Sequence, residues 1–442
     1  MSLPGKENPR NTSRPRLGLV AAHDSSGGAA RAAFRVFEAL HEHESERLDT
    51  YFRAIHSTTG HPKVLAGKPV RNRREYAEYF LRTRFRKHFP RPPFSSPNKL
   101  LHSQALYHSG LARELNDGDW DILLLNWLGN ATLSIPEIGR LSPATVWLLH
   151  DMWMFSGAEH YTDTDRAASG YSRASRPKTE SGPDIDRETF RRKRRHWKTP
   201  QHVICPSNWM AQQVRRSALT QHWPTHVIPY PINLDKWAER DRNTARQRFN
   251  LPTEAIVVLS GIAGGSGPSH KGGDLFFEAL GHLDARIRET GHGRPVIAAF
   301  FGEARPDEAF GNITLRFLGK LDDQGVADAY AAANVMVVPS RQDNFPSTGT
   351  EPQVGARPVV AFGTAGLTDI VEDGVTGRLA APFDSASLAE AIEWVVIDPD
   401  RERALGQAAR DRAVRLWEPR KIAAQYADVL IAAYEEQRKP RG

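Results

Sequence analysis

The feature that most constrains the fold of this chain is an alternation between short apolar runs and longer segments with helical spacing. The first apolar runs cover residues 17–22, 122–125, 145–149 and 203–205. Runs that are apolar at nearly every position are typical of parallel strands whose two faces are both buried. Such strands, alternating with helices, predict an α/β domain built on a parallel sheet.

The same alternation starts again in the second half of the chain. Its apolar runs cover residues 256–260, 296–301, 314–317, 335–338 and 358–361. A chain of 442 residues also exceeds what one hydrophobic core usually organises. The sequence therefore predicts two α/β domains.

A connector near residues 228–237 holds two prolines and no regular period, so it is expected to join the two domains. We expect a disordered tail at 1–16, a first domain at 17–230, a second domain at 231–415 and a final helix at 416–442. The tail is polar and lacks the apolar centre of a signal peptide.

Composition narrows the class of partner without choosing one. The formal charge of +7 favours anionic partners such as nucleotides, phospholipid headgroups or nucleic acid. Cys205 is the one cysteine, which excludes an internal disulfide and a cysteine cluster for zinc, and is compatible with a reducing cytosol. No apolar stretch approaches the length that spans a bilayer.

The loop that follows the predicted strand at 335–338 is the most informative segment. Ligands of open α/β sheets bind beyond the carboxyl ends of the strands, where this loop lies. The backbone N–H groups of Ser347, Thr348 and Gly349 are expected to point at an anion, as they do at other helix N-termini. Pro352 suits the first position of the helix that follows.

Two carboxylates in this loop are candidates for polar recognition. The paired oxygens of Glu351 suit two adjacent ribose hydroxyls. Asp343 lies eight positions earlier and could hold the hydroxyls of a sugar. The alternative is an ordinary strand-to-helix turn with solvated carboxylates.

A glycine-rich loop at 259–274 (LSGIAGGSGPSHKGGD) follows the first strand of the second domain. Its glycines permit close approach of the backbone to a phosphate, Gly272 among them, and Lys271 supplies a cation. The loop is not a P-loop, because the Lys-Ser/Thr ending is missing. The alternative is a flexible surface loop.

Two further candidates follow strands of the first domain. Gly27 and Gly28 would let a helix N-terminus approach a ligand, although a plain turn explains a Gly-Gly pair equally well. His150 stands at the carboxyl end of the strand at 145–149, where a histidine commonly has a purely structural role.

These residues together resemble the motifs of glycosyltransferase family 4. Asp343 and Glu351 resemble its carboxylate-x7-carboxylate signature, and the run DNFPSTGTE resembles the branch that builds colanic-acid-like and other bacterial exopolysaccharides. Lys271-Gly272 matches the pair that binds the donor diphosphate. The run GGAAR at 27–31 resembles a loop that faces the donor, and HDMW at 150–153 resembles a segment whose histidine lies beside the transferred sugar.

The chain also departs from the family pattern. Ile262 and Ala263 stand where many members carry an arginine, and Pro352 and Gln353 stand where alanine and a bulky apolar residue are common. Glu159 stands where relatives often show a cysteine, so any metal or disulfide role of that cysteine cluster is lost here.

The resemblance implies a GT-B fold: α/β, with two Rossmann-like domains whose parallel sheets face an inter-domain cleft, and a final helix that packs back on the first domain. It implies a retaining, metal-independent glycosyltransferase whose donor is a GDP- or UDP-linked sugar and whose acceptor is a saccharide or a lipid-linked molecule. The expected site is His150, Asp343 and Lys271 for catalysis, with donor binding by Gly27, Gly28, Gly272, Ser347, Thr348, Gly349 and Glu351. No metal ligands and no cofactor beyond the donor are expected.

Other functions of the same scaffold stay open. They are a nucleotide-sugar epimerase or hydrolase, a sugar-phosphate synthase, and a non-catalytic protein that binds nucleotide sugars. Transfer to an acceptor separates the main hypothesis from all but the synthase, whose acceptor would be small and soluble.

Three segments stand apart from the α/β pattern. Residues 71–94 interleave arginines with Tyr and Phe, which predicts contact with an anionic membrane and a cytoplasmic protein held at the inner membrane face, or else a solvated helix. No recognisable module supports nucleic acid as a partner. Residues 162–186 predict a long mobile loop, and 191–195 (RRKRR) a solvated helix face.

Overall fold

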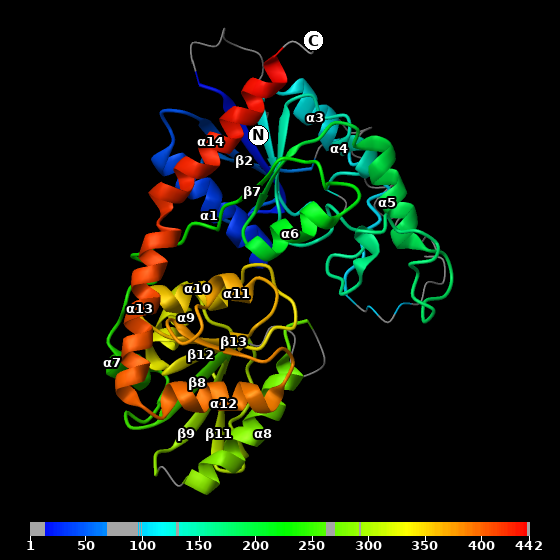
Figure 1. Cartoon of the computed structure of the whole chain (residues 1–442). Helices are drawn as coiled ribbons and strands as arrows, with labels where there is room; N and C mark the ends of the chain where they lie inside the picture. Colours follow the sequence, from blue (N-terminus) through cyan, green and yellow to red (C-terminus); the bar gives the residue numbers. More distant parts are fainter. Residues whose placement is uncertain are drawn as a thin grey trace. The chain divides into compact units, whose positions relative to one another are not determined.

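A computed structural model describes residues 14–68, 96, 98, 100–129, 132–261, 270–290 and 293–439 (Figure 1). The expected tail therefore lies mostly outside the described residues, and the arginine-rich segment 71–94 lies wholly outside them. The chain divides into two compact units, the first formed by 1–231 with 420–442 and the second by 232–419.

The first unit is built on a seven-stranded sheet with the order β3-β2-β1-β4-β5-β6-β7. Every neighbouring pair in it is parallel. The strands are β1 (Arg16–His23), β2 (Asp49–His56), β3 (Val64–Ala66), β4 (Ile122–Leu125), β5 (Ala144–Leu148), β6 (His202–Cys205) and β7 (Thr225–Val227). The order reverses between β1 and β4, because β2 lies on one side of β1 and β4 on the other.

The described part of the first unit contains six α-helices, and several of them begin after a residue whose side chain caps the helix. They are α1 (Gly28–His43), α3 (Leu111–Asp117), α4 (Ile135–Ile138), α5 (Ile185–His196), α6 (Asn208–Arg216) and α14 (Pro419–Arg438). Ser134 and Glu137 form a capping box at α4, and the Ser207 hydroxyl accepts from an amide at the start of α6.

Helix α14, at the carboxyl end of the chain, packs on the first unit (Figure 1). Tyr426 is fully buried, and its hydroxyl donates to the carbonyl oxygen of Ile228 at 3.4 Å. Glu436 lies 3.0 Å from Nε2 of His202 in β6. The helix thus shares the core and the polar surface of the first sheet, although the whole second unit (232–419) separates it from β7 in the chain.

The segment at 162–186 is not the unanchored loop that its composition predicts. It contains little regular structure beyond one short 3₁₀ turn (Asp165–Ala167), yet Tyr171 is fully buried and its ring lies 4.9 Å from that of Phe190 in α5. The Arg166 guanidinium is buried beside Tyr171 and forms an ion pair with Asp184 at 2.6 Å. The buried ring of Tyr171 and the buried guanidinium of Arg166 therefore hold this polar segment without periodicity in place.

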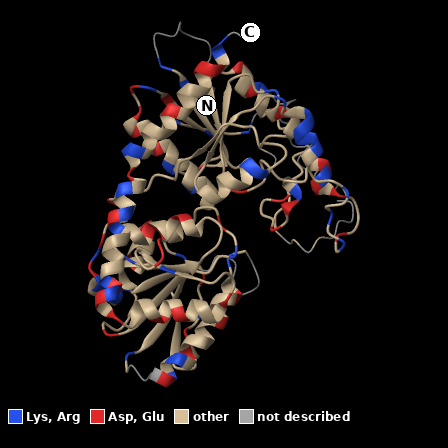
Figure 2. Cartoon of the chain, in the orientation of Figure 1, with Lys and Arg blue, Asp and Glu red and all other residues tan. Residues whose placement is uncertain are grey.

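The basic run in α5 is only partly a solvated face. Arg191, Arg194 and Arg195 are exposed, and Figure 2 shows the basic residues over this helix. Lys193, in contrast, is fully buried, and its ammonium donates to the carbonyl oxygens of Ser156 at 3.1 Å and Gly157 at 2.8 Å. Burial lowers the pKa of Lys193 well below its usual value.

The second unit is built on another seven-stranded sheet, with the order β10-β11-β9-β8-β12-β13-β14. Only the pair β10–β11 is antiparallel in it. The strands are β8 (Ile256–Gly261), β9 (Val296–Phe301), β10 (Glu308–Phe310), β11 (Ile313–Phe317), β12 (Val335–Val338), β13 (Val359–Phe362) and β14 (Gly377–Ala380). The order reverses between β8 and β12.

Helices connect these strands and cover the second sheet. They are α7 (Arg242–Arg248), α8 (Gly273–Thr290), α9 (Asp323–Ala332), α10 (Ser347–Val354), α11 (Leu367–Ile370), α12 (Ser385–Val396) and α13 (Pro399–Trp417). The predicted fold class, two Rossmann-like α/β domains with largely parallel sheets, is confirmed. Four of the strands that the sequence analysis did not predict, β3, β7, β10 and β14, lie at sheet edges, where the apolar pattern is weak. The strand β2 was also not predicted, although it lies inside the first sheet, between β3 and β1.

A buried arginine ties four elements of the second unit together. Arg246 in α7 is 1% exposed, and it donates to the carbonyl oxygen of Ala332 at 3.0 Å and to Oδ1 of Asn334 at 2.9 Å. The same Asn334 oxygen accepts from the amide of Val257 in β8, and Nδ2 of Asn334 donates to Glu402 in α13. Burial lowers the pKa of Arg246 to about 10, so it stays charged at neutral pH.

We expect Arg246→Ala to lower the free energy of unfolding of the second unit by about 3 kcal/mol or more, because buried acceptors lose charged donors. Arg248→Ala, in the same helix and exposed, is the matched control and should cost less than about 1 kcal/mol. Denaturant unfolding of the full chain measures both. Equal losses in the two variants would contradict the role given to Arg246.

Candidate functional site

Each sheet has one place where the strand order reverses, and ligands of open α/β sheets bind beyond the carboxyl ends of the strands at such a place. In the second unit the loops after β8 and β12 meet there, and they carry Lys271 and Asp343. Glu351 lies in α10, the helix that follows the second of these loops. In the first unit the loops after β1 and β4 meet there, and β5 lies next to β4. The predicted residues therefore gather at the carboxyl ends of the central strands, at one such place in each unit.

An ion pair joins the two loops of the second unit. The Nζ atom of Lys271 lies 2.5 Å from Oδ2 of Asp343. The lysine side chain is 38% exposed and the aspartate side chain 9%. The two residues predicted on separate grounds, one as a phosphate-binding cation and one as a sugar-binding acid, are thus direct neighbours.

Close backbone packing at Gly272 keeps these loops together. Gly272 has a φ of +69°, and a Cβ atom built on it would lie 1.9 Å from the carbonyl oxygen of Pro339. The amide of Arg341 donates to the carbonyl oxygen of His270 at 2.8 Å, and the Arg341 guanidinium forms two bonds of 2.6 Å with Asp274. Only glycine fits at 272, for reasons of both conformation and space.

Helix α10 begins at Ser347, with Ser347 and Thr348 half-buried in its first turn. The Gly349 amide was expected to point at an anion, but it donates to the carbonyl oxygen of Pro346 at 3.0 Å. Pro352 was expected at the first helical position but lies inside the helix. A proline at this position has no N–H to donate to the carbonyl oxygen of Thr348, four residues earlier, so one bond is missing from this short helix, which ends at Val354.

Glu351 lies in the second turn of α10 and is 5% exposed. The hydroxyl of Tyr330, in α9, donates to its Oε2 atom at 2.9 Å. Rings of Trp237 and Phe301 lie 5.9 and 6.0 Å from the Tyr330 ring. Tyr330 thus fixes the direction of the carboxylate, a role that no local pattern in the sequence indicates.

In the first unit, His150 follows β5 and is held on both ring nitrogens. Its Nε2 atom lies 3.1 Å from Oδ1 of Asn126, and its Nδ1 atom lies 2.8 Å from the hydroxyl of Tyr230. The rings of His150 and Tyr230 stack at 5.4 Å. Burial lowers the pKa of His150 to about 4 against the opposing charge of Asp151, so the ring is neutral at pH 7. The sequence missed Asn126, although it directly follows a predicted strand.

Gly27 and Gly28 lie where β1 gives way to α1. Gly27 precedes the helix with a φ of +89°, and both glycines are exposed, so that a Cβ atom added to either would meet no atom within 4 Å. Nearby, Asp24 is buried and accepts hydrogen bonds from Ser57 and Thr59, which lie after β2. The sharp turn at Gly27 leaves the N-terminus of α1 open to solvent.

A second histidine network lies beside His150. Nδ1 of His160 lies 2.5 Å from Asp151, and its Nε2 lies 2.7 Å from the Ser103 hydroxyl. These groups border a cavity of about 20 Å³, which is lined in part by Asn126 and His150. Such a volume holds about one water molecule, so the network is a packed support for the loop after β5 and not a binding pocket.

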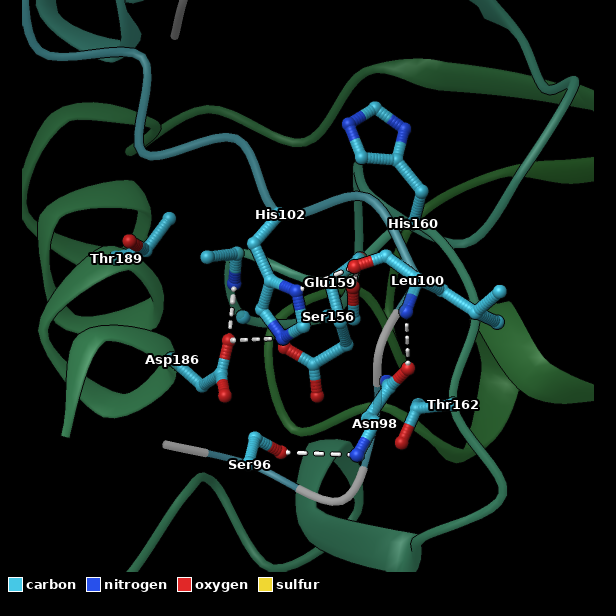
Figure 3. Close-up of polar contacts among 12 residues, drawn as sticks. Ser96, Asn98, Leu100, His102, Ser156, Glu159, His160, Thr162, Asp186 and Thr189 are labelled. Atoms are coloured by element: carbon cyan, nitrogen blue, oxygen red, sulfur yellow. Dashed lines mark hydrogen bonds and ion pairs between the residues drawn. The ribbon is translucent and has the colours of Figure 1, made fainter. Parts of the chain in front are cut away.

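A buried acid, Glu159, lies close to the His160 network and is 3% exposed. Figure 3 shows Glu159 grouped with Asp186 and His102. The hydroxyl of Tyr171 donates to Glu159 at 2.6 Å, and His102 lies 3.9 Å from Asp186. Burial and the neighbouring Asp186 raise the pKa of Glu159 well above its usual value.

A set of three carboxylates in the described part of the chain is close enough to share a cation: Glu180, Asp184 and Asp186. Arg166 lies 3.6, 2.6 and 3.8 Å from them, in that order. Its guanidinium already supplies positive charge to this acidic group.

The second unit is similar to a known family of proteins. Residues 241–412 match the model of glycosyl transferases group 1. A D-inositol 3-phosphate glycosyltransferase of Geodermatophilus obscurus is 31% identical over 221 residues, which are 48% of this chain and 47% of the relative. One from Streptomyces bingchenggensis is 32% identical over 229 residues, 49% of each chain. The chain thus matches about half the length of these curated relatives.

Solved structures match the whole fold at low sequence identity. Sucrose-phosphate synthase from Thermosynechococcus elongatus has a TM-score of 0.63 at 18% identity, covering 96% of this chain and 100% of its own. Anabaena HepE in complex with UDP-glucose has a TM-score of 0.64 at 15% identity, covering 95% and 100%. These likenesses show a GT-B type of fold. Residues 241–412, which include Lys271, Asp343 and Glu351, are similar to the glycosyl transferases group 1 family.

Proposed function

We propose that this protein is a retaining glycosyltransferase that moves a sugar from a GDP- or UDP-linked donor to a hydroxyl of a saccharide or lipid-linked acceptor, in the manner of the colanic-acid and exopolysaccharide branch. The observation that carries the proposal is the Lys271–Asp343 ion pair at the switch point of the second sheet, with buried Glu351 in the helix that follows Asp343. A cation and two acids at that edge match what a nucleotide diphosphate sugar requires.

The donor would be bound by groups with separate tasks. Glu351, aimed by Tyr330, accepts hydrogen bonds from the ribose hydroxyls. Lys271 and the amides at the start of α10 face the diphosphate, with Gly272 allowing the close approach. Anabaena HepE, which has the same fold, has been solved with UDP and with UDP-glucose, which supports a nucleotide sugar as the ligand.

In the proposed reaction the bond between the anomeric carbon and the diphosphate oxygen breaks, and a bond to the acceptor oxygen forms on the same face. The proton of the acceptor hydroxyl passes to the departing diphosphate. Negative charge grows on that diphosphate in the transition state, and the preorganised Lys271 ammonium and helix amides stabilise it. Because these groups supply the positive field, we propose that no metal is needed. Asp343 and His150 would orient the sugar.

The acceptor side belongs to the first unit in this proposal, together with Gly27 and Gly28 near the donor. The chain would work in the cytoplasm, and residues 71–94, outside the described part, would touch an anionic membrane surface in polysaccharide or glycoconjugate synthesis. Among the described residues, none of the helices is both long and apolar enough to cross a bilayer.

The first test uses binding. A thermal-shift screen of UDP, GDP and their sugars identifies the donor, because a ligand raises the stability only of the protein that binds it. Gly272→Ala should weaken binding of the identified nucleotide at least about tenfold, since a Cβ atom would push the loop of Lys271 off Pro339.

The matched control for this binding test is Gly281→Ala. Gly281 lies within α8, and a Cβ atom there would meet no atom within 4 Å. This change should leave nucleotide affinity unchanged and add about 1 kcal/mol of stability, because alanine favours a helix interior over glycine. Equal affinities for the two variants would exclude the glycine loop from the donor site.

The second test uses transfer. Asp343→Asn and Glu351→Gln keep the side-chain shapes and remove the charges, so each should lower kcat/KM at least about tenfold, or about 1.4 kcal/mol. Asp411→Asn, on the exposed surface of α13, is the control and should match the wild type. Undiminished transfer by both variants would refute the site.

Incubation with donor alone separates the rival functions. Turnover without an acceptor would indicate an epimerase or hydrolase. Tight donor binding with no turnover under any acceptor would indicate a binding protein.

A further inference from the structure

The hydrogen bonds around His150 fix which of its nitrogens carries the proton. The side chain of Asn126 is 3% exposed, and its Nδ2 atom donates to the carbonyl oxygen of Leu124 at 3.0 Å. That bond turns Oδ1, which can only accept, toward Nε2 of His150 at 3.1 Å. The backbone amide of Asn126 also donates to the carbonyl oxygen of Val20 in β1 at 3.0 Å, so the residue is anchored on both backbone and side chain.

Because Oδ1 of Asn126 accepts, Nε2 of His150 must donate. The other nitrogen, Nδ1, then carries no proton in the neutral ring. The Tyr230 hydroxyl lies 2.8 Å from Nδ1 and 3.0 Å from the carbonyl oxygen of Leu149, so in this tautomer its single proton goes to Nδ1, the nearer acceptor. Tyr230 is 7% exposed and stacks on the ring with an interplanar angle of 13°. The imidazole is therefore held in one tautomer, and its plane is fixed by a neighbouring ring.

The groups that face His150 from each side carry little net charge toward it. Asn126 and Tyr230 are neutral, and the Tyr161 hydroxyl donates to the His150 carbonyl oxygen at 3.2 Å. The neighbouring Asp151 is the one acid close by among the described residues, and its carboxylate is occupied by His160 at 2.5 Å and by the amide of Trp153 at 2.9 Å. Burial without a facing carboxylate keeps the ring uncharged, with a pKa of about 4.

We propose that Asn126 is a positioning residue that holds His150 neutral, with its proton on Nε2, for the sugar-transfer step. The inference rests on the proposed function, which places His150 beside the transferred sugar. In that step the anomeric carbon becomes cation-like, and an imidazolium beside it would repel the developing positive charge. An amide at 126 provides an acceptor for Nε2–H without the negative charge that would draw a second proton onto the ring.

The decisive variant is Asn126→Asp, because a carboxylate can accept the same hydrogen bond but favours the imidazolium. The carboxylate raises the pKa of His150, so the ring is charged below the new pKa and neutral above it. We expect kcat for transfer to fall at least about tenfold at pH 6 and to recover as the pH rises. Wild-type kcat should show no step assignable to His150 between about pH 6 and 8, because the pKa of the ring is about 4.

A spectroscopic readout makes the test independent of activity. Nitrogen-15 NMR of histidine-labelled protein, with His150 assigned by comparison with His150→Gln, should show a neutral ring protonated on Nε2 in the wild type. It should show an imidazolium in Asn126→Asp at pH 6. Asn126→Leu removes the acceptor without adding charge, and should lose the single tautomer and lower kcat equally at all pH values.

Asn116 supplies the matched control. It lies in α3 of the same unit and bonds through both side-chain ends, from Nδ2 to the Arg140 carbonyl oxygen and from Oδ1 to the Ser142 amide, each at 2.8 Å. Asn116→Asp should leave the His150 spectrum and the pH profile unchanged. A neutral His150 in Asn126→Asp, or a pH-independent loss of activity in that variant, would overturn the proposal. If His150 shows the predicted tautomer but the protein transfers no sugar, the assignment of Asn126 stands and the proposed function is refuted.

Discussion

The contact on which the candidate site depends is the packing of Gly272 against the carbonyl oxygen of Pro339. It presses the loop after β8 onto the loop after β12, at the point where the strand order of the second sheet reverses. A side chain at 272 would separate the loops, and with them Lys271 and Asp343. The rest of the site depends on this contact, because α10, which contains Glu351, directly follows the loop that holds Asp343.

The first unit has the same architecture as the second but a different kind of polar group at the carboxyl ends of its strands. At the carboxyl ends of its strands lies a neutral histidine, His150, between the Asn126 amide and the stacked Tyr230 ring. The second unit has a charged pair, Lys271 and Asp343, at the corresponding place. Beside His150, polar groups are buried in satisfied networks, as with His160 between Asp151 and Ser103. Buried polar networks of this kind are costly to leave half satisfied, so they favour one arrangement of the loop after β5.

The basic and aromatic side chains that hold residues 156–186 show how a polar segment without periodicity can still be fixed. Tyr171 fills a small core against Phe190, while Lys193 binds carbonyl oxygens and Arg166 binds carboxylates. Composition alone predicted mobility here, because serine, arginine, glycine and proline give no period that indicates packing. The segment is held by a few long-range contacts of single residues, and no local pattern in the sequence indicates such contacts.

The sequence by itself determined the two α/β domains and central strands such as β1, β8 and β12, because buried parallel strands leave continuous apolar runs. It also determined the segments after these strands that carry Lys271, Asp343, Glu351 and His150, because motifs are local. Only the tertiary structure decided that Lys271 meets Asp343, that Tyr330 aims Glu351, that Gly349 donates within its own helix turn, and that Asn126 and Tyr230 enclose His150. Of these pairings, the one between His150 and Tyr230 joins residues 80 positions apart in the chain, and the one between Lys271 and Asp343 joins residues 72 positions apart. They arise from strand order and from close packing, neither of which a local pattern of residues encodes.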